Sequence, residues 1–317
     1  MAHNDARVVE LVDSLASGAS ARKGVRVRLP PRAPIPELLY QQFRDFFDLS
    51  GFGIIWQVAR NPFQFLKKDD EVSMSKSKQY FSNAIDLLKK VSDTQSESIR
   101  QAVDAVSDTL KRDGMIFAFG TGHSHMLAEE LFYRAGGLVK VYPIFDESLM
   151  LHANATRSSQ VECLPGYAAT LVENGPEMKA GDVIFIFSNS GRNAVPIEMA
   201  MQAKSRGLCV ICITNLAHSS SVTSRHSSGK KLYELCDIVI DNCGVIGDTS
   251  VKIGGLTCGP TSTVAGAAIL QAIVCGVVER LQEDGAVPEV FISGNVDGGH
   301  EKNQVYYEKY RKLIRML

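Results

Sequence analysis

The sequence predicts an α/β fold built on a parallel sheet that helices cover on both faces. Five short apolar runs follow one another along the chain, and stretches with helical spacing separate them. Each run is apolar at nearly every position, whereas a strand with one wet face would alternate apolar and polar residues. Such strands, alternating with helices, are typical of a covered parallel sheet. The expected strands are Met115–Phe119, Val139–Ile144, Val183–Phe187, Cys209–Ile213 and Ile238–Ile240.

Helical spacing of apolar residues predicts the helices around this sheet. Before the first strand, apolar residues recur at helical intervals from Tyr80 to Val91 and again from Ile99 to Leu110. The last expected helix is apolar along much of its length, so we expect it to be buried. The later helices are expected over His125–Ala135, Thr156–Val172, Pro196–Arg206 and from about Thr261 to Glu283.

Residues 1–75 differ from the rest of the chain. Prolines at 30, 31, 34 and 36 interrupt any long element there. We therefore expect residues 1–75 to form an N-terminal extension of unknown role that could be partly disordered. Residues 76–317 are expected to form one domain.

The composition is that of an ordinary soluble globular protein. Apolar residues make up 45% and charged residues 22% of the 317 residues, with a formal net charge of −1. A nearly neutral chain gives no electrostatic support for nucleic-acid binding. No uninterrupted apolar stretch approaches the ~20 residues of a membrane span, and the start lacks the basic-then-apolar order of a secretory signal. We expect a cytoplasmic protein with no nucleic-acid or membrane partner.

The cysteines do not suggest a disulfide framework. There are seven, an odd number without paired spacing. Cys209 and Cys212 have the spacing of a redox pair, but both fall in an expected strand. Residues three apart in a strand point to opposite faces, so these thiols are not expected to meet.

Two loops rich in hydrogen-bond donors follow the first and third expected strands. Small residues after a strand often only make a tight turn, but two such loops in one domain suggest a phosphate and its attached sugar. Each loop leads into an expected helix, whose first N–H groups are free to bind an anion. Open parallel sheets also bind ligands at this edge. The expected phosphate ligands are Gly120, Thr121, Gly122, His123, Ser124, Ser188, Asn189, Ser190, Gly191 and Asn193.

Two common phosphate motifs are missing from these loops. A dinucleotide fingerprint needs a third glycine, and His125 stands at that place. A nucleotide P-loop ends in Gly-Lys-Ser or Gly-Lys-Thr, which the sequence lacks. The remaining donors are uncharged, and each hydrogen bond to a charged acceptor contributes roughly 1.5–3 kcal/mol. Four or five of them could hold a monophosphate.

The same motifs resemble the sugar isomerase (SIS) domain family. Phe119–Ser124 is similar to its first phosphate loop, and Phe187–Gly191 to its Ser-x-Ser-Gly loop, although Asn193 stands where threonine is usual. The likeness covers about residues 75–315. Gly122–Gly137, Leu149–His152 and Asn295–Gly299 resemble a poorly characterised branch of single-SIS-domain proteins, described only as phosphosugar isomerases or binding proteins.

The resemblance implies a fold and a ligand class. It implies a three-layer α/β/α sandwich with a five-stranded parallel sheet, and a homodimer with the sugar pocket near the subunit boundary. The implied ligand is a phosphorylated sugar or amino sugar. Aldose–ketose isomerisation is the first functional hypothesis, and a non-catalytic phosphosugar sensor is the alternative, because SIS domains also serve in transcription regulators.

An isomerase would need a base to move a proton and a group to open the ring. Related isomerases carry the base on the helix after the first loop, where Glu129 and Glu130 stand, and the sequence does not choose between them. His152 is a candidate for ring opening, and Glu162 lies where it could reach a neighbouring subunit's pocket. No cofactor is expected, because the proton moves within one substrate. No metal is expected either, because His123 and His125 lack further ligands at useful spacing.

Overall fold

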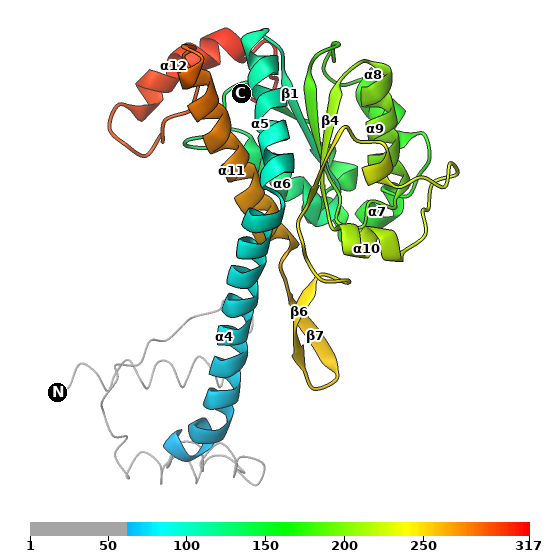
Figure 1. Ribbon diagram of the computed structural model, residues 1–317, viewed down its shortest axis with the longest axis vertical. Coiled ribbons are helices and arrows are strands. Elements are labelled where there is room, and N and C mark those ends of the chain that lie inside the picture. The colour runs from blue at the N-terminus through cyan, green and yellow to red at the C-terminus, as the bar shows by residue number, and fades with distance from the viewer. Residues whose placement is uncertain (1–61) are drawn as a thin grey trace, which may run out of the picture. The chain divides into compact units, whose positions relative to one another are not determined.

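Five parallel strands form the central sheet of the computed structural model, which describes the backbone of residues 62–317 and the side chains from residue 75 onward. Figure 1 shows the sheet, in which the strand order is β2-β1-β3-β4-β5. All neighbouring pairs are parallel. The predicted α/β class and parallel sheet are confirmed. The strands are β1 (Ile116–Gly120), β2 (Val141–Pro143), β3 (Val183–Phe187), β4 (Cys209–Thr214) and β5 (Ile238–Asp241).

Helices cover both faces of the sheet, and successive strand residues point into two separate cores. In β1, Ile116 packs with the first core and Phe117 with the second. Cys209 and Cys212 likewise divide between the two cores, as the strand spacing predicts. The three-layer sandwich is therefore confirmed (Figure 1). The first core contains α5 (Ser96–Lys111), α6 (His125–Leu131) and α11 (Ser262–Glu283), and the second contains α8 (Tyr167–Glu173) and α9 (Ala194–Ser205).

Two helix predictions are wrong in their bounds. The single helix expected over Thr156–Val172 is two helices, α7 (Leu151–Val161) and α8, because Pro165 and the left-handed Gly166 (φ 83°) separate them. Helix α6 ends at Leu131, since Tyr133 has a φ of 47° that a helix cannot continue.

Helix α11 is buried along one face only. Residues such as Ile269, Ile273 and Val277 are fully buried, and they pack in the first core. The opposite face carries exposed small or apolar residues. The prediction that this helix is buried is therefore confirmed for one face only. Among the described helices, α11 is the one long and apolar enough to cross a membrane, a test that core helices of soluble proteins also pass. The exposed face is formed by Val264, Ala268, Ala272 and Cys275.

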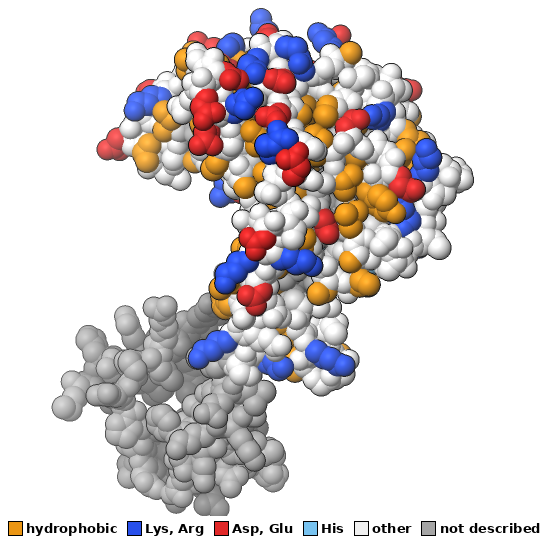
Figure 2. Space-filling model, viewed as in Figure 1, with side chains coloured by type: hydrophobic (Ala, Val, Ile, Leu, Met, Phe, Trp, Pro, Cys, Tyr) orange, Lys and Arg blue, Asp and Glu red, His pale blue; other side chains and the backbone are white. Residues whose placement is uncertain are grey.

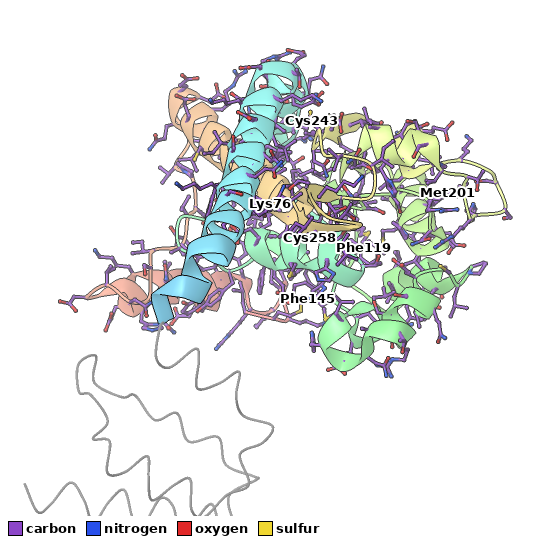
Figure 3. The ribbon with its side chains drawn as sticks, turned by 90° about the horizontal axis from the view of Figure 1, so that it is seen from below. Lys76, Phe119, Phe145, Met201, Cys243 and Cys258 are labelled. Carbon is purple, nitrogen blue, oxygen red and sulfur yellow. The ribbon has the colours of Figure 1, made fainter. Side chains whose placement is uncertain are left out.

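The helical spacing from Tyr80 to Val91 predicted part of the long helix α4 (Pro62–Thr94), and the spacing from Ile99 to Leu110 predicted α5; both are confirmed. Several further elements were not predicted. One is the antiparallel hairpin of β6 (Thr249–Ile253) and β7 (Leu256–Pro260), which lies beside α4 in Figures 1 and 3. The Tyr80 hydroxyl donates a hydrogen bond of 2.9 Å to the Pro260 carbonyl and fixes this contact. The remaining elements are α10 (Leu216–Ser221), α12 (Gly299–Tyr310) and the 3-10 turns η1 (Gly122–Ser124), η2 (Glu147–Leu149) and η3 (Leu232–Glu234).

The predicted division of the chain at residue 75 stays a prediction. The structure does not describe residues 1–61, which make up most of the expected N-terminal extension. The expectation of partial disorder there is therefore untested. The chain separates into two compact units between Asp69 and Asp70, and the sheet belongs to the second. Acidic and basic side chains are interspersed over the face of this unit seen in Figure 2.

Candidate functional site

The two donor-rich loops begin side by side at the carboxyl edge of the sheet. Gly120 at the end of β1 pairs with Phe187 at the end of β3. The residues that follow leave the sheet at the same edge, where open α/β sheets bind their ligands. The structure thus places the first loop, Gly120–Ser124, next to the second, Ser188–Asn193.

Glycine is required at one position of the first loop and favoured at a second. A Cβ atom on Gly120 would lie only 2.5 Å from the Ser124 carbonyl oxygen. Gly122 has a φ of 56°, in the left-handed region that residues with a side chain avoid. The Ser124 amide donates to the Thr121 carbonyl at 3.0 Å and closes the turn η1 before α6 begins. The loop is therefore a tight turn held against the start of α6.

The second loop is closed by its own hydrogen bonds. The Gly191 amide donates to the Ser188 hydroxyl oxygen at 3.2 Å, and the Thr214 hydroxyl donates to the Ser188 carbonyl at 2.7 Å. Asn189 accepts a bond of 2.8 Å from the side chain of Asn242, just after β5. Because Ser188 only accepts in these bonds, its own hydroxyl proton stays free for a ligand.

Both loops line one small pocket at this edge. Ser124 comes from the first loop, Ser188 from the second, and the start of α11 supplies a third wall. The lining contains no lysine or arginine, so an anion here would depend on hydroxyls, amides and the positive end of α11. The lining residues are His123, Ser124, Leu127, Ser188, Asn189, Ile213, Asn242, Ser262 and Thr263.

The other predicted phosphate ligands do not line this pocket. The Thr121 hydroxyl donates to the Glu162 carboxylate at 2.7 Å, and the Asn193 side chain accepts from Arg225 at 2.9 Å. Ser190 is half-buried, and its hydroxyl has no hydrogen bond to another described residue. Of the predicted side chains, the pocket therefore gathers those of His123, Ser124, Ser188 and Asn189.

The two adjacent glutamates of α6 have different surroundings. Glu130 accepts hydrogen bonds from Arg134 at 2.5 Å and from Gln271 of α11 at 2.9 Å. Glu129 is 51% exposed, and its carboxylate lies 3.5 Å from the ring of His125. Neither lines the small pocket. Glu130 is thus held between α6 and α11, whereas Glu129 points largely to solvent.

The two remaining catalytic candidates, His152 and Glu162, lie near opposite ends of α7. His152 is exposed, and its ring centre is 6.1 Å from that of His125. Glu162 is half-buried at the end of α7, with one carboxylate oxygen held by the Thr121 hydroxyl. Glu162 therefore reaches the first loop of its own chain.

Two cations lie in or near the second loop, Arg192 within it and Lys231 farther along the chain. The Lys231 ammonium is buried and donates to the carbonyls of Ser219 and Val222, while burial, helped by the Arg192 charge, lowers its pKa. Arg192 has a buried Nε without a hydrogen-bond partner among the described residues. Neither residue lines the pocket, but both charges add positive potential near it.

Sequence reasoning missed the residues that complete the pocket. Asn242 follows β5, and Ser262 and Thr263 open α11. The signal for Asn242 was available, because it is a polar residue directly after a strand that ends at the same sheet edge. Asp248, in the turn before β6, caps α11 by accepting from the Thr261 and Ser262 amides at 3.1 and 2.9 Å.

Asp248→Ala is expected to loosen this wall of the pocket. It removes the cap of α11 and leaves alanine at a φ of 64°, so we expect unfolding to become easier by about 2 kcal/mol. Chemical denaturation measures the change. Asp297→Ala, at an exposed aspartate with no side-chain bond among the described residues, is the control. Equal stability of the two variants would contradict the capping role.

The described side chains contain no group of three or more His, Cys, Asp or Glu residues able to hold a metal ion. The arrangement offers hydrogen-bond donors for an oxyanion and nearby carboxylates for proton transfer. The expectation that no metal or cofactor takes part stays a prediction.

The fold and the two loops define a SIS-domain protein, and the family model of the SIS domain matches residues 79–215. The UPF0309 protein from Geobacillus thermodenitrificans is 45% identical over 241 residues, covering 75% of this chain and 96% of its own. The UPF0309 protein from Listeria innocua is 44% identical over 240 residues, covering 75% and 97%. The chain belongs to this UPF0309 family of SIS-domain proteins.

Solved structures with an overall likeness are more distant. A phosphoheptose isomerase from Francisella tularensis has a TM-score of 0.45 at 15% identity, covering 65% of this chain and 98% of its own. The Vibrio vulnificus NanR protein complexed with ManNAc-6P has a TM-score of 0.43 at 20% identity, covering 75% and 73%.

Proposed function

We propose that the chain binds a phosphorylated sugar or amino sugar at the carboxyl edge of the sheet. One observation carries the proposal: Ser124 of the first loop and Ser188 of the second line the same pocket. A phosphate ester seated there would accept from both hydroxyls and from loop amides. Membership of the SIS-domain family supports the same ligand class.

A thermal-shift panel tests the ligand class. Hexose, pentose and amino-sugar phosphates are compared with the same sugars without phosphate, on the full chain. A ligand that binds only the folded state adds about 2.7 kcal/mol at a concentration 100 times its Kd. We expect stabilisation by at least one phosphorylated sugar and none by its parent sugar. Equal shifts from both would contradict a phosphate site.

Aldose–ketose isomerisation is the favoured activity, and Glu162 is the favoured base. Its carboxylate is half-buried, has one oxygen oriented by Thr121, and adjoins the phosphate loop. Glu130 is the second candidate, because it lies beside the exposed face of α11 and could serve a neighbouring subunit. Glu129 and His152 are exposed, so their participation would need closure by substrate or a partner.

Glu162→Gln is expected to separate catalysis from binding. The amide keeps an oxygen acceptor for Thr121 but cannot take a proton, so turnover of the best ligand should fall about 100-fold or more while binding persists. Glu173→Gln, at an exposed glutamate of α8, is the matched control. If turnover survives in Glu162→Gln but is lost in Glu130→Gln, the base is Glu130. Tight binding without turnover in the wild-type chain would favour the sensor instead.

The chain is also proposed to form a homodimer through the exposed face of α11. Its small side chains, from Val264 to Cys275, would let a second helix approach closely, and the start of α11 borders the pocket. The partner would then complete a site that is small within one chain. This arrangement agrees with the subunit-boundary pocket that the family resemblance implies.

Ala272→Arg is expected to convert this dimer to a monomer. A charged, bulky side chain in the middle of the exposed face of α11 would prevent close approach. Light scattering after size exclusion measures the mass. Ala153→Arg, at an exposed alanine of α7, should leave the mass unchanged. Identical masses for both variants would place the interface elsewhere.

A further inference from the structure

The pocket at the carboxyl edge of the sheet presents a hydrogen-bond acceptor as well as donors. Ser262 lines the pocket, and its hydroxyl donates its single proton to the Asp248 carboxylate at 2.5 Å. A bond of this length to a carboxylate is a strong, charge-assisted hydrogen bond. The Ser262 oxygen therefore offers the pocket only its lone pairs, which accept.

Asp248 is fixed where it keeps that proton. One of its carboxylate oxygens accepts from the backbone amides of Thr261 and Ser262, at 3.1 and 2.9 Å, so the side chain is tied to the start of α11. Its negative charge offsets the positive end of the helix dipole at this point. A ligand atom that reaches Ser262 thus meets an acceptor with a negative charge behind it.

The two loops supply the donors. The Gly244 amide donates to Asn242 Oδ1 at 3.0 Å, and because a backbone N–H can only donate, this bond fixes the orientation of the Asn242 amide. Asn242 Nδ2 then donates to Asn189 Oδ1 at 2.8 Å, which leaves the Asn189 amino group as a donor. The Ser188 hydroxyl proton is also free, so both kinds of hydrogen-bonding group line one pocket.

A second negative charge on a bound phosphate would have no cation beside it. Among the described residues, no lysine or arginine lines the pocket, and both Arg192 and Lys231 lie outside the lining. The titratable side chains around the pocket are the exposed His123 in its lining and Asp248 behind Ser262. Burying a charge without a partner costs free energy, so the pocket suits a ligand group of low charge.

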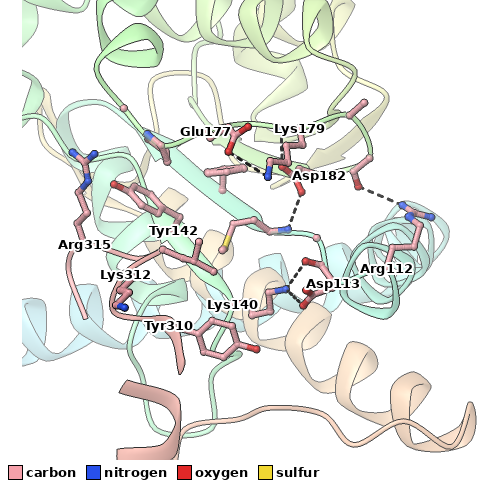
Figure 4. Close-up of a pocket in the computed structure, with 18 of the residues that line it drawn as sticks. Arg112, Asp113, Lys140, Tyr142, Glu177, Lys179, Asp182, Tyr310, Lys312 and Arg315 are labelled. Carbon is pink, nitrogen blue, oxygen red and sulfur yellow. Dashed lines mark hydrogen bonds and ion pairs between the residues drawn. The ribbon is translucent and has the colours of Figure 1, made fainter. Parts of the chain in front are cut away.

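The amino-terminal edge of the sheet has the opposite character. A cavity there is lined by basic side chains, among them Lys140 and Lys179 (Figure 4). These two pair with Asp113 at 2.6 Å and with Glu177 at 3.2 Å. The fold thus places lysines in a cavity and balances them with carboxylates at one edge, whereas the carboxyl-edge pocket is built from uncharged groups.

A phosphate monoester has two charge states near neutral pH, because its second proton leaves with a pKa of about 6. The dianion carries only acceptor oxygens, so an oxygen turned toward Ser262 would face another acceptor. The monoanion keeps one P–OH group, which can donate to Ser262 while its other oxygens accept from Ser124 and Ser188. Only the monoanion satisfies every wall of the pocket.

We propose that the pocket selects the singly protonated, monoanionic form of a phosphate ester, and that Ser262, held by Asp248, determines this selectivity. The proposal rests on the sugar-phosphate pocket proposed above and adds the charge state that the pocket accepts. Ser262 takes the hydrogen bond of the P–OH group, and Asp248 keeps the Ser262 proton out of the pocket.

Isothermal titration of the full chain at pH 6, 7 and 8 tests this selectivity. The probes are glucose 6-phosphate, N-acetylglucosamine 6-phosphate and ribose 5-phosphate, with glucose 6-sulfate as an ester that has one charge and no proton. From pH 8 to pH 6 the monoanionic fraction rises from about 1% to about half, so affinity for a phosphate ester that binds should rise about 50-fold. Glucose 6-sulfate should bind at least about 10-fold more weakly than glucose 6-phosphate at pH 6.

The outcomes separate this proposal from the one it rests on. If none of the three phosphates binds at any pH, the phosphate pocket itself is wrong. If a phosphate binds equally well at pH 6 and pH 8, or more tightly at pH 8, only the selectivity for the monoanion is overturned. His123→Gln removes the titratable group of the lining and should keep the rise toward pH 6. Loss of the rise in that variant would assign it to His123 and contradict the role of Ser262.

Asp248→Asn is expected to remove the selectivity and keep the fold. Asparagine tolerates the φ of 64° and still caps α11 through its oxygen, so the unfolding temperature should stay near that of the wild type. Its amino group would donate to Ser262 and turn the Ser262 proton into the pocket. The rise in affinity from pH 8 to pH 6 should then shrink at least about 10-fold, while Asp297→Asn, at an exposed aspartate, keeps it.

Ser262→Ala removes the acceptor without touching the cap. Affinity for the phosphate probes should fall about 10-fold at pH 6 and less at pH 8, because only the monoanion uses this bond. Wild-type pH profiles in both Asp248→Asn and Ser262→Ala would overturn the proposal.

Discussion

Ser124→Asp should abolish sugar-phosphate binding. The new carboxylate would face the phosphate across the small pocket, and two like charges about 4 Å apart repel by roughly 4 kcal/mol at an effective dielectric constant near 20. Affinity should therefore fall by about 1000-fold or more. Isothermal titration with the best ligand of the thermal-shift panel measures the loss.

Two further variants test whether the loss of affinity is specific to a charge at position 124. Ser124→Ala removes one hydrogen bond to a charged acceptor, which costs about 1.5–3 kcal/mol of binding free energy. Affinity should therefore fall only about 10- to 150-fold. Ser159→Asp adds the same charge at an exposed position of α7 and should bind normally. Unchanged affinity in Ser124→Asp would place the phosphate outside this pocket.

Gly120→Ala should destabilise the domain and disrupt the first loop. The added methyl carbon would lie 2.5 Å from the Ser124 carbonyl oxygen and 2.9 Å from the His125 amide nitrogen. These are backbone atoms that cannot turn aside, so we expect a loss of about 3 kcal/mol in unfolding free energy. The start of α6 would move, and binding should weaken with it.

The matched glycine change is Gly255→Ala in the turn of the β6–β7 hairpin. A Cβ atom there meets nothing within 4 Å, and the residue does not have a positive φ. The free energy of unfolding of Gly255→Ala should stay within about 0.5 kcal/mol of the wild-type value. Denaturant titration of both variants checks the comparison. A Gly120→Ala variant as stable as Gly255→Ala would mean that the loop is not packed as described.

Much of the fold could be predicted from the sequence because its strands carry a strong local signal. Runs such as Val183–Phe187 are apolar at every position, and this pattern alone requires cover on both faces. The prediction of one helix over Thr156–Val172 was wrong because the apolar spacing continues past Pro165, where the chain cannot stay helical. The hairpin of β6 and β7 could not be predicted, since its residues are largely exposed and alternate weakly.

The candidate site could be predicted only where it is continuous in the chain. The two loops were recognisable because each follows a strand directly. Asn242 and Thr263 enter the pocket through tertiary structure, from segments far from either loop. The side chains of Thr121 and Asn193 looked like ligands by position, but hydrogen bonds to Glu162 and Arg225 engage them. Such competition between partners cannot be read from spacing.

The most direct measurement is a crystal structure of the chain with the sugar phosphate that stabilises it most. Phosphate oxygens within hydrogen-bond distance of both the Ser124 and the Ser188 hydroxyls are the predicted result. A phosphate bound at only one of these serines, or found elsewhere on the chain, would contradict the shared carboxyl-edge site.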